Sequence, residues 1–220
     1  DIKGEAHEIK AKNINPYLVE GNDLVIEKRA KSLCKVNPIK YGSIAIDNGF
    51  LILNEDEKID LIKREPLSEK YIFTYGGGAE FIKNIKRYCL WLKDLNPNEL
   101  KLMPIVKEKI DSVRDFRFSS DREATKKLAE YPTLFGEDRQ PKNNYILIPK
   151  VSSETRQYIP LGFLNKSHIA NGSSMIVENA TLFEFGILTS IMHMAWIKYT
   201  CGRMKSDYQY SNTIVYNNYP

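Results

Sequence analysis

Tyr145-Ile146-Leu147-Ile148 decides the fold of this 220-residue chain, because it is a short, unbroken apolar run that follows a polar stretch. Such a run is typical of a strand that is buried on both faces. Two more strands are predicted after it, at Tyr158-Ile159-Pro160-Leu161 and at Ser174-Met175-Ile176-Val177. Thr181 then opens a long apolar helix, which we predict from Phe183 to about Tyr199.

The sequence before this region predicts short strands and helices. Phe50-Leu51-Ile52-Leu53 indicates a buried strand, and Asn54 with Glu57 has the pattern of a capping box that opens a helix. Pro66 breaks this helix, and a second helical stretch is predicted up to about Phe73.

The middle of the chain is predicted to be mostly helical. Gly76-Gly77-Gly78 lacks the spacing of a nucleotide-binding loop and indicates a flexible turn. Tyr88-Cys89-Leu90-Trp91-Leu92 predicts a strand, because its aromatic and apolar residues suit a pleated surface. Amphipathic helices follow between Asn96 and Tyr131, where apolar residues at near-helical spacing alternate with charged ones.

Together these elements predict an α+β fold with short mixed or antiparallel sheets, an inserted helical region and a long buried helix near the C-terminus. We interpret residues 1–23 as an arm from a preceding part of the protein. Residues 24–141 are interpreted as a mixed, largely helical subdomain, and residues 142–220 as a strand-rich subdomain of the same domain. The first residue is not Met and both ends read as internal positions, so we expect a longer parent protein.

Composition restricts the class of protein. The net charge of +4 is compatible with a polyanionic partner without requiring one. Three widely spaced cysteines do not form a disulfide framework, which favours the reducing cytoplasm. The sequence contains no apolar stretch long enough to span a membrane, so we expect no membrane partner.

The sequence offers no convincing catalytic constellation. Asn15-Pro16-Tyr17 lacks the second proline of the loop that holds the target amine in amino-methylating DNA enzymes, and a plain turn explains it better. His193 lies in an apolar helix and is predicted to be a core histidine, while Ser152 and Ser153 have no His/Asp partners for nucleophilic chemistry. We therefore predict no catalytic residue, no metal site and no cofactor site in this chain.

Lys205 and Asp207 form the most suggestive pair for recognition of a base pair. In one extended segment their side chains would point the same way, so that the lysine donates to guanine O6 and N7 while the aspartate accepts from cytosine N4. Gln209 continues on the same face. Spacing alone favours the alternative interpretation, an ordinary surface charge pair.

Several long runs resemble the target-recognition domain of MmeI-type enzymes, which are type II restriction–modification proteins of bacteria. The resemblance covers essentially the whole chain. The matching runs are 12–18 (KNINPYL), 87–92 (RYCLWL), 131–137 (YPTLFGE), 148–154 (IPKVSSE), 179–182 (NATL), 189–196 (TSIMHMAW), 201–208 (CGRMKSDY) and 214–220 (IVYNNYP).

The resemblance implies a module for DNA sequence recognition that follows an adenine-N6 DNA methyltransferase core in the same polypeptide. It implies that S-adenosylmethionine binds in that core, and that a divalent metal is needed only where the parent carries a nuclease module. Double-stranded DNA and the methyltransferase core are the expected partners, and the cytoplasm is the expected location.

The resemblance also implies positions of base readout. A Lys/Asp combination at 205 and 207 goes with guanine beside the methylated adenine in this family, whereas Glu/Arg goes with cytosine. The implied base-reading residues are Lys205, Asp207, Gln209, Lys150, Gly172 and Ser173. Apart from the resemblance, residue type predicts DNA backbone contacts at Arg203, Arg156, Lys166 and Lys150, helped by Ser152 and Ser153.

Two alternatives remain open from the sequence. A protein–protein interaction module predicts an exposed apolar patch and no salt-dependent binding of duplex DNA. A free-standing nuclease predicts carboxylates clustered around a divalent metal.

Overall fold

The computed structural model describes residues 8–18 and 20–220; residues 1–7 and 19, which belong to the predicted arm, lie outside it. The strands are β1 (Ile39–Tyr41), β2 (Ile52–Leu53), β3 (Ile72–Gly76), β4 (Tyr88–Leu90), β5 (Tyr145–Pro149), β6 (Val151–Ser152), β7 (Gly162–Leu164), β8 (His168–Ala170), β9 (Ser174–Glu178), β10 (Gly202–Met204) and β11 (Asp207–Gln209). The α-helices are α1 (Glu55–Arg64), α2 (Gly78–Lys83), α3 (Pro97–Leu100), α4 (Pro104–Phe118), α5 (Glu123–Lys127), α6 (Leu182–Leu188) and α7 (Ile191–Thr200), and shorter helical turns are η1 (Pro66–Tyr71), η2 (Leu128–Glu130) and η3 (Asn212–Tyr216).

β5 lies inside a four-stranded sheet with the order β1-β9-β5-β7, in which all neighbours are antiparallel. All five of its residues are buried, as the apolar run predicts. Ile146 and Ile148 face one hydrophobic cluster, and Tyr145 and Leu147 face another, because successive side chains of a strand point to opposite faces. The predicted α+β class is confirmed.

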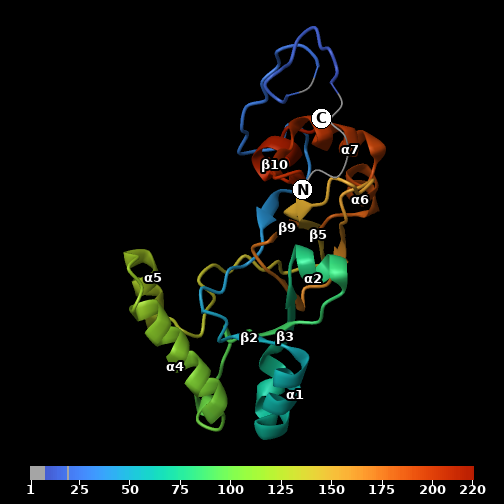
Figure 1. The fold of residues 1–220 in the computed structure, drawn as a ribbon. Helices are drawn as coiled ribbons and strands as arrows, with labels where there is room; N and C mark the ends of the chain where they lie inside the picture. Colours follow the sequence, from blue (N-terminus) through green and yellow to red (C-terminus); the bar gives the residue numbers. More distant parts are fainter. Residues whose placement is uncertain (1–7, 19) are drawn as a thin grey trace.

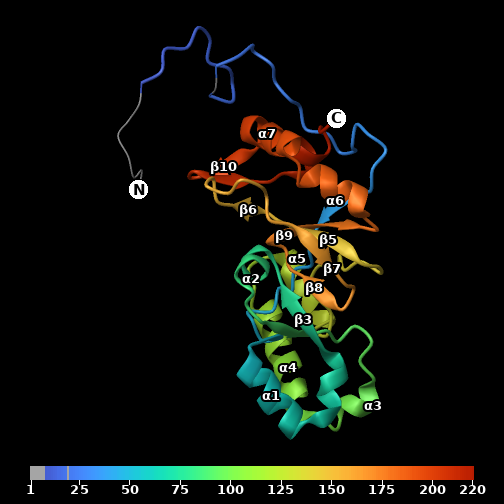
Figure 2. The same cartoon turned by 90° about the vertical axis from the view of Figure 1, so that its right-hand side faces the viewer.

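The other two sheets flank this one along an elongated molecule. Figures 1 and 2 show α1 and α4 at one end and α6, α7 and β10 at the other, with β5 and β9 between them. A second sheet has the order β2-β4-β3-β8, and a third, small sheet has the order β10-β11-β6. β3 and β8 pair in parallel, so the second sheet is mixed.

Two of the sheets contain strands from both sides of the predicted boundary at 141/142. β1 comes from the first part of the chain and pairs with β9 of the second part. Conversely, β8 comes from the second part and pairs with β3 of the first. The boundary therefore marks a change in sequence composition, while the two parts share their sheets.

The helix predicted after Asn54 is confirmed as α1. The Asn54 side chain accepts a hydrogen bond from the Glu57 N–H at 2.9 Å, and the Glu57 carboxylate accepts one from the Asn54 N–H at 2.8 Å. The helical stretch after Pro66 is also present, but it ends at Tyr71 and gives way to β3.

The C-terminal helix predicted from Phe183 to about Tyr199 is two helices, α6 and α7. Ser190 adopts an extended conformation between them, and its hydroxyl accepts a hydrogen bond from the His193 N–H at 3.1 Å. Serine is a preferred N-cap because it satisfies one of the free N–H groups at a helix start. The break is only two polar residues long, Thr189 and Ser190, and apolar residues resume at Ile191, so the two short helices read as one.

The strand predicted at 158–161 does not form. Ile159 and Leu161 are buried in the core, but the strand β7 begins one residue later, at Gly162. Pro160 has no N–H to donate to a ladder, so the segment packs without pairing.

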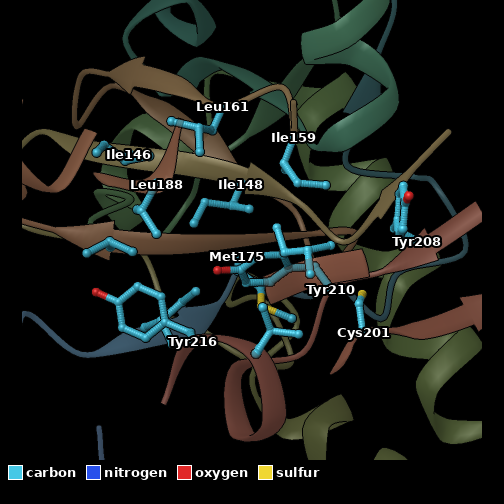
Figure 3. Close-up of a cluster of buried hydrophobic side chains, with 14 of the residues drawn as sticks. Ile146, Ile148, Ile159, Leu161, Met175, Leu188, Cys201, Tyr208, Tyr210 and Tyr216 are labelled. Atoms are coloured by element: carbon cyan, nitrogen blue, oxygen red, sulfur yellow. The ribbon is translucent and has the colours of Figure 1, made fainter. Parts of the chain in front are cut away.

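The core under β5 and β9 includes side chains from α7 and from β11. Figure 3 shows Ile148, Met175 and Tyr210 converging there. His193 of α7 is completely buried beside this core, as predicted for a core histidine. Its Nδ1 donates to the Leu188 carbonyl oxygen at 2.8 Å, and the Tyr210 hydroxyl lies 3.2 Å from Nε2.

Burial lowers the pKa of His193 to about 4, from an ordinary value of 6.5. His193 is neutral in the folded state and binds a proton more readily in the unfolded state. Its contribution to stability is therefore complete above pH 6.5 and is lost as the pH falls towards about 4. We expect His193 to account for roughly 3 kcal/mol of lost unfolding free energy over that range. Urea denaturation of the intact protein and of His193→Gln at several pH values measures this, and the same pH dependence in both proteins would refute it.

No helix in the described ranges is long and apolar enough to cross a membrane.

Candidate nucleic-acid interface

A hollow of about 480 Å³ lies between α2 on one side and β6 and β11 on the other. Its lining brings together residues from α2, the β5–β6 junction, the loop before β9, the loop after β6 and the start of β11. The lining residues are Gly78, Ala79, Ile82, Lys83, Lys150, Val151, Ser153, Arg156, Ser173 and Asp207. Five predicted site residues therefore meet here: Lys150, Ser153, Arg156, Ser173 and Asp207.

Lys150 lies between β5 and β6, where the main chain holds it on both sides. Its N–H donates to the Ser173 carbonyl oxygen at 3.0 Å, and its carbonyl oxygen accepts from the Tyr210 N–H at 2.8 Å. The ammonium group lies 5.5 Å from the centre of the Tyr41 ring, within the range of a cation–π contact. The lysine backbone is thus fixed while its charge remains available.

Arg156 is supported by Ser152. The guanidinium Nη1 donates to the Ser152 Oγ at 3.4 Å. Ser152 is 2% exposed and pairs with Tyr208 across β6 and β11, so in this structure it positions Arg156 and has no open surface of its own. Ser153 lies at the hollow, and its hydroxyl is 3.0 Å from the Thr155 hydroxyl.

Lys205 and Asp207 do not share one extended segment, so the premise of our spacing argument is wrong. β10 and β11 form an antiparallel hairpin, and Lys205 and Ser206 are the turn between them. Lys205 has a φ of 56°, in the left-handed region that is frequent in tight turns. Lys205 is exposed at the hairpin tip, whereas Asp207 is partly buried at the start of β11.

Asp207 is oriented towards the hollow. Its Oδ1 accepts a hydrogen bond from the Glu154 N–H at 3.3 Å, which connects the hairpin to the loop after β6. Gln209 is two residues further along β11, so its side chain leaves the same side of the strand. The donor of the predicted pair therefore lies in the turn of the hairpin, and the acceptor lies at the first position of β11 directly after the turn.

Arg203 lies on the opposite side of this hairpin. It pairs directly with Tyr208, and directly paired residues project from the same side. Its guanidinium carbon lies 3.9 Å from the centre of the Tyr208 ring, and Nη1 donates to the Ser206 carbonyl oxygen at 3.2 Å. Arg203 thus covers a buried tyrosine and is not among the residues that line the hollow.

Two more predicted residues lie outside the hollow. Lys166 is exposed in the turn between β7 and β8, where its carbonyl oxygen accepts from the Gln140 side chain at 3.1 Å. Gly172 lies in the loop before β9, where a Cβ would meet the Ile44 side chain at 3.0 Å.

Gly76-Gly77-Gly78 is a close packing junction, and the predicted flexible turn is wrong. Gly76 ends β3 and Gly78 begins α2, with Gly77 between them. A Cβ on Gly77 would lie 2.0 Å from the Asn171 Oδ1 and 2.1 Å from the Ser173 Oγ, so any other residue there would displace these two side chains. The Gly78 N–H donates to the Ser173 Oγ at 3.2 Å, which connects α2 to the loop before β9.

This junction does not fit S-adenosylmethionine. The Asn171 and Ser173 side chains occupy the space beside Gly77, so the backbone of this glycine is not open to a bound nucleoside. Within residues 8–18 and 20–220 there is also no group of three or more His, Cys, Asp or Glu side chains placed to hold a metal ion.

Comparison with known proteins identifies the family. The family model described as "MmeI, target recognition domain" matches residues 20–220. The chain belongs to the MmeI target recognition domain family. This confirms the resemblance on which the functional expectations rest.

Two relatives of this target recognition domain are informative. "DNA methyltransferase A" of Bacillus subtilis (strain 168) is 35% identical over 208 residues, which are 94% of this chain and 24% of that protein. A solved structure of the type IIL restriction–modification enzyme MmeI in complex with DNA superimposes with a TM-score of 0.93 at 41% identity, and covers 97% of this chain and 29% of that one. The target recognition domain therefore spans about a quarter of the length of these relatives.

One wall of the hollow in this target recognition domain contains no residue that was predicted from the sequence. α2 contributes Gly78, Ala79, Ile82 and Lys83. The basic segment at 83–87 (KNIKR) is the signal that could have drawn attention to it.

Proposed function

We propose that this target recognition domain binds duplex DNA at the hollow and reads bases in the major groove. The observation that carries the proposal is the set of three cations around the hollow, Lys83, Lys150 and Arg156. None of them forms an ion pair with a carboxylate within the described part of the chain, so all three charges around the hollow can meet a ligand. Unpaired cations in a hollow are suited to phosphate oxygens.

The proposed roles follow from charge and position. Lys150 and Arg156 bind phosphates, with Ser152 and Ser153 supporting the arginine loop. Lys205 donates to guanine, and Asp207 accepts from the exocyclic amine of the paired cytosine. The remaining proposed base contacts are Gln209, Gly172 and Ser173, and Arg203 and Lys166 are proposed backbone contacts outside the hollow.

The proposed parent is a bacterial adenine-specific DNA methyltransferase or a fused restriction–modification enzyme in the cytoplasm. The names of the two relatives and their greater length support this assignment. S-adenosylmethionine would bind to the methyltransferase core of the same polypeptide, which lies outside this chain. That core would receive an adenine flipped out of the duplex that the recognition domain positions.

Binding of duplex DNA by the intact protein tests this function. Because phosphate contacts release counterions, we expect the logarithm of the affinity to fall linearly with the logarithm of the salt concentration. A short duplex with the modified site is compared with a scrambled duplex of equal length. Absence of any salt-dependent binding would refute the proposal.

The same measurement distinguishes a protein–protein interaction module. Apolar side chains are exposed on α6 and α7, among them Leu182, Phe183, Ile191 and Met192, and such a surface suits a protein contact. A module with only this function would not bind duplex DNA in a salt-dependent way. Salt-dependent binding leaves the apolar surface available for contact with the rest of the polypeptide.

A further inference from the structure

α2 presents one face to the hollow and anchors the opposite face in the core. Gly78 and Ala79 are each four residues before Ile82 and Lys83, so these four residues share one side of the helix. Phe81 projects from another side and packs against the cluster of Tyr145, Leu147, Ala170 and Ile176. The core contact therefore determines which face of α2 looks into the hollow.

The end of α2 fixes the position of Lys83. Asn84 follows it with a φ of 52°, and this left-handed residue ends the helix. The Asn84 N–H donates to the Glu80 carbonyl oxygen, which closes the last turn. Lys83 is thus held at the rim of the hollow with an exposed side chain.

Glu80, the single carboxylate of α2, is hydrogen-bonded to residues other than Lys83. Glu80 accepts a hydrogen bond from the Gly77 N–H at 2.9 Å and another from the Arg87 guanidinium at 3.2 Å. These partners hold the pKa of Glu80 below its ordinary value against the effect of burial, so the carboxylate is charged at neutral pH and compensated by them. Lys83 makes no ion pair with any described residue, and its charge is available to a ligand.

Lys83 and Lys150 are coupled through the loop before β9. Ser173 accepts from the Gly78 N–H with its hydroxyl and from the Lys150 N–H with its carbonyl oxygen, at 3.2 and 3.0 Å. The same hydroxyl donates to the Asn171 Oδ1 at 2.6 Å. Ser173 therefore holds two walls of the hollow at a fixed separation.

We infer that Lys83 binds a backbone phosphate of the DNA, on the wall of the hollow opposite β11. This inference rests on the proposed function and extends the DNA contact to α2. A DNA strand in the hollow would then be contacted from two sides, by Lys83 on one wall and by Arg156 on the other. Lys83 contributes affinity that does not depend on base sequence, because a phosphate carries no sequence information.

The experiment compares Lys83→Ala, Lys83→Arg and the wild-type intact protein, with two duplexes between about 50 and 200 mM salt. We expect Lys83→Ala to reduce the slope of log affinity against log salt by about 0.9, equally for the site-containing and the scrambled duplex. Lys83→Arg should restore the slope. Lys107→Ala is the matched control, because Lys107 is exposed on α4, far from the residues that line the hollow, and should leave the slope unchanged.

Two results would overturn the inference and leave the proposed function standing. One is an unchanged slope in Lys83→Ala while Lys150→Ala reduces it. The other is a change in the ratio of affinities for the two duplexes, which would make Lys83 a base contact. A wild-type protein that binds neither duplex with salt dependence would instead overturn the proposed function itself.

Discussion

Lys205→Glu combined with Asp207→Arg is expected to change one position of the DNA site modified by the intact protein from G to C. The exchange reverses the polarity of the two side chains. A carboxylate at 205 accepts from cytosine N4, and a guanidinium at 207 donates to guanine O6 and N7 on the opposite strand. The single variant Lys205→Ala should lose about 1–3 kcal/mol of discrimination at that position alone.

Sequencing of modified bases in a host that expresses the variant measures the change. The matched control is Lys126→Glu with Glu123→Arg, which reverses an exposed ion pair of 3.0 Å on α5. The control should leave the modified site unaltered. If the hairpin variant also leaves it unaltered, Lys205 and Asp207 do not read that base pair.

Arg117→Met is expected to destabilise the fold by about 3–5 kcal/mol, a large share of the usual stability of a domain. Arg117 is completely buried in α4 and donates to five carbonyl oxygens. These belong to Ala45, Ile46, Leu128, Tyr131 and Leu134, at 2.8 to 3.0 Å. Methionine fills much of the volume but supplies no donor. The Ile46 and Leu134 carbonyl oxygens then lose their donor, and those of Ala45, Leu128 and Tyr131 keep only a backbone N–H.

Arg114→Met on the same helix is the control for Arg117→Met. Arg114 is exposed and its ion pair with Asp111 spans three residues, so its loss should cost less than about 1 kcal/mol. Urea denaturation of the two variants gives the comparison. Equal unfolding free energies would show that the buried guanidinium does not hold the loops around residues 45 and 131 together.

The parts of the fold that depend on neighbouring residues could be predicted from the sequence. The capping box of Asn54 and Glu57 is a local pattern, and α1 begins where it indicates. The apolar run 145–148 is long enough to identify a buried strand, and β5 is that strand. By contrast, the pairing of β1 with β9 and of β3 with β8 depends on contacts far apart in the chain, which local patterns do not encode.

In the site, too, some features could be predicted from the sequence and others depend on contacts far apart in the chain. Lys150, Arg156 and Asp207 could be selected by residue type and by the family resemblance, and they meet in one hollow. The hairpin turn at Lys205 could not be seen, because the residues on both sides alternate as they would in a single strand. α2 was missed because three glycines usually indicate a turn, and here the reason for glycine at 77 is its contact with residues 171 and 173.

The most direct test of the hollow as the DNA-binding surface is the salt dependence of duplex binding by Lys150→Ala combined with Arg156→Ala in the intact protein. If both cations neutralise phosphates, the slope of log affinity against log salt should become shallower by about 1.8. A slope equal to that of the wild-type protein would contradict the account.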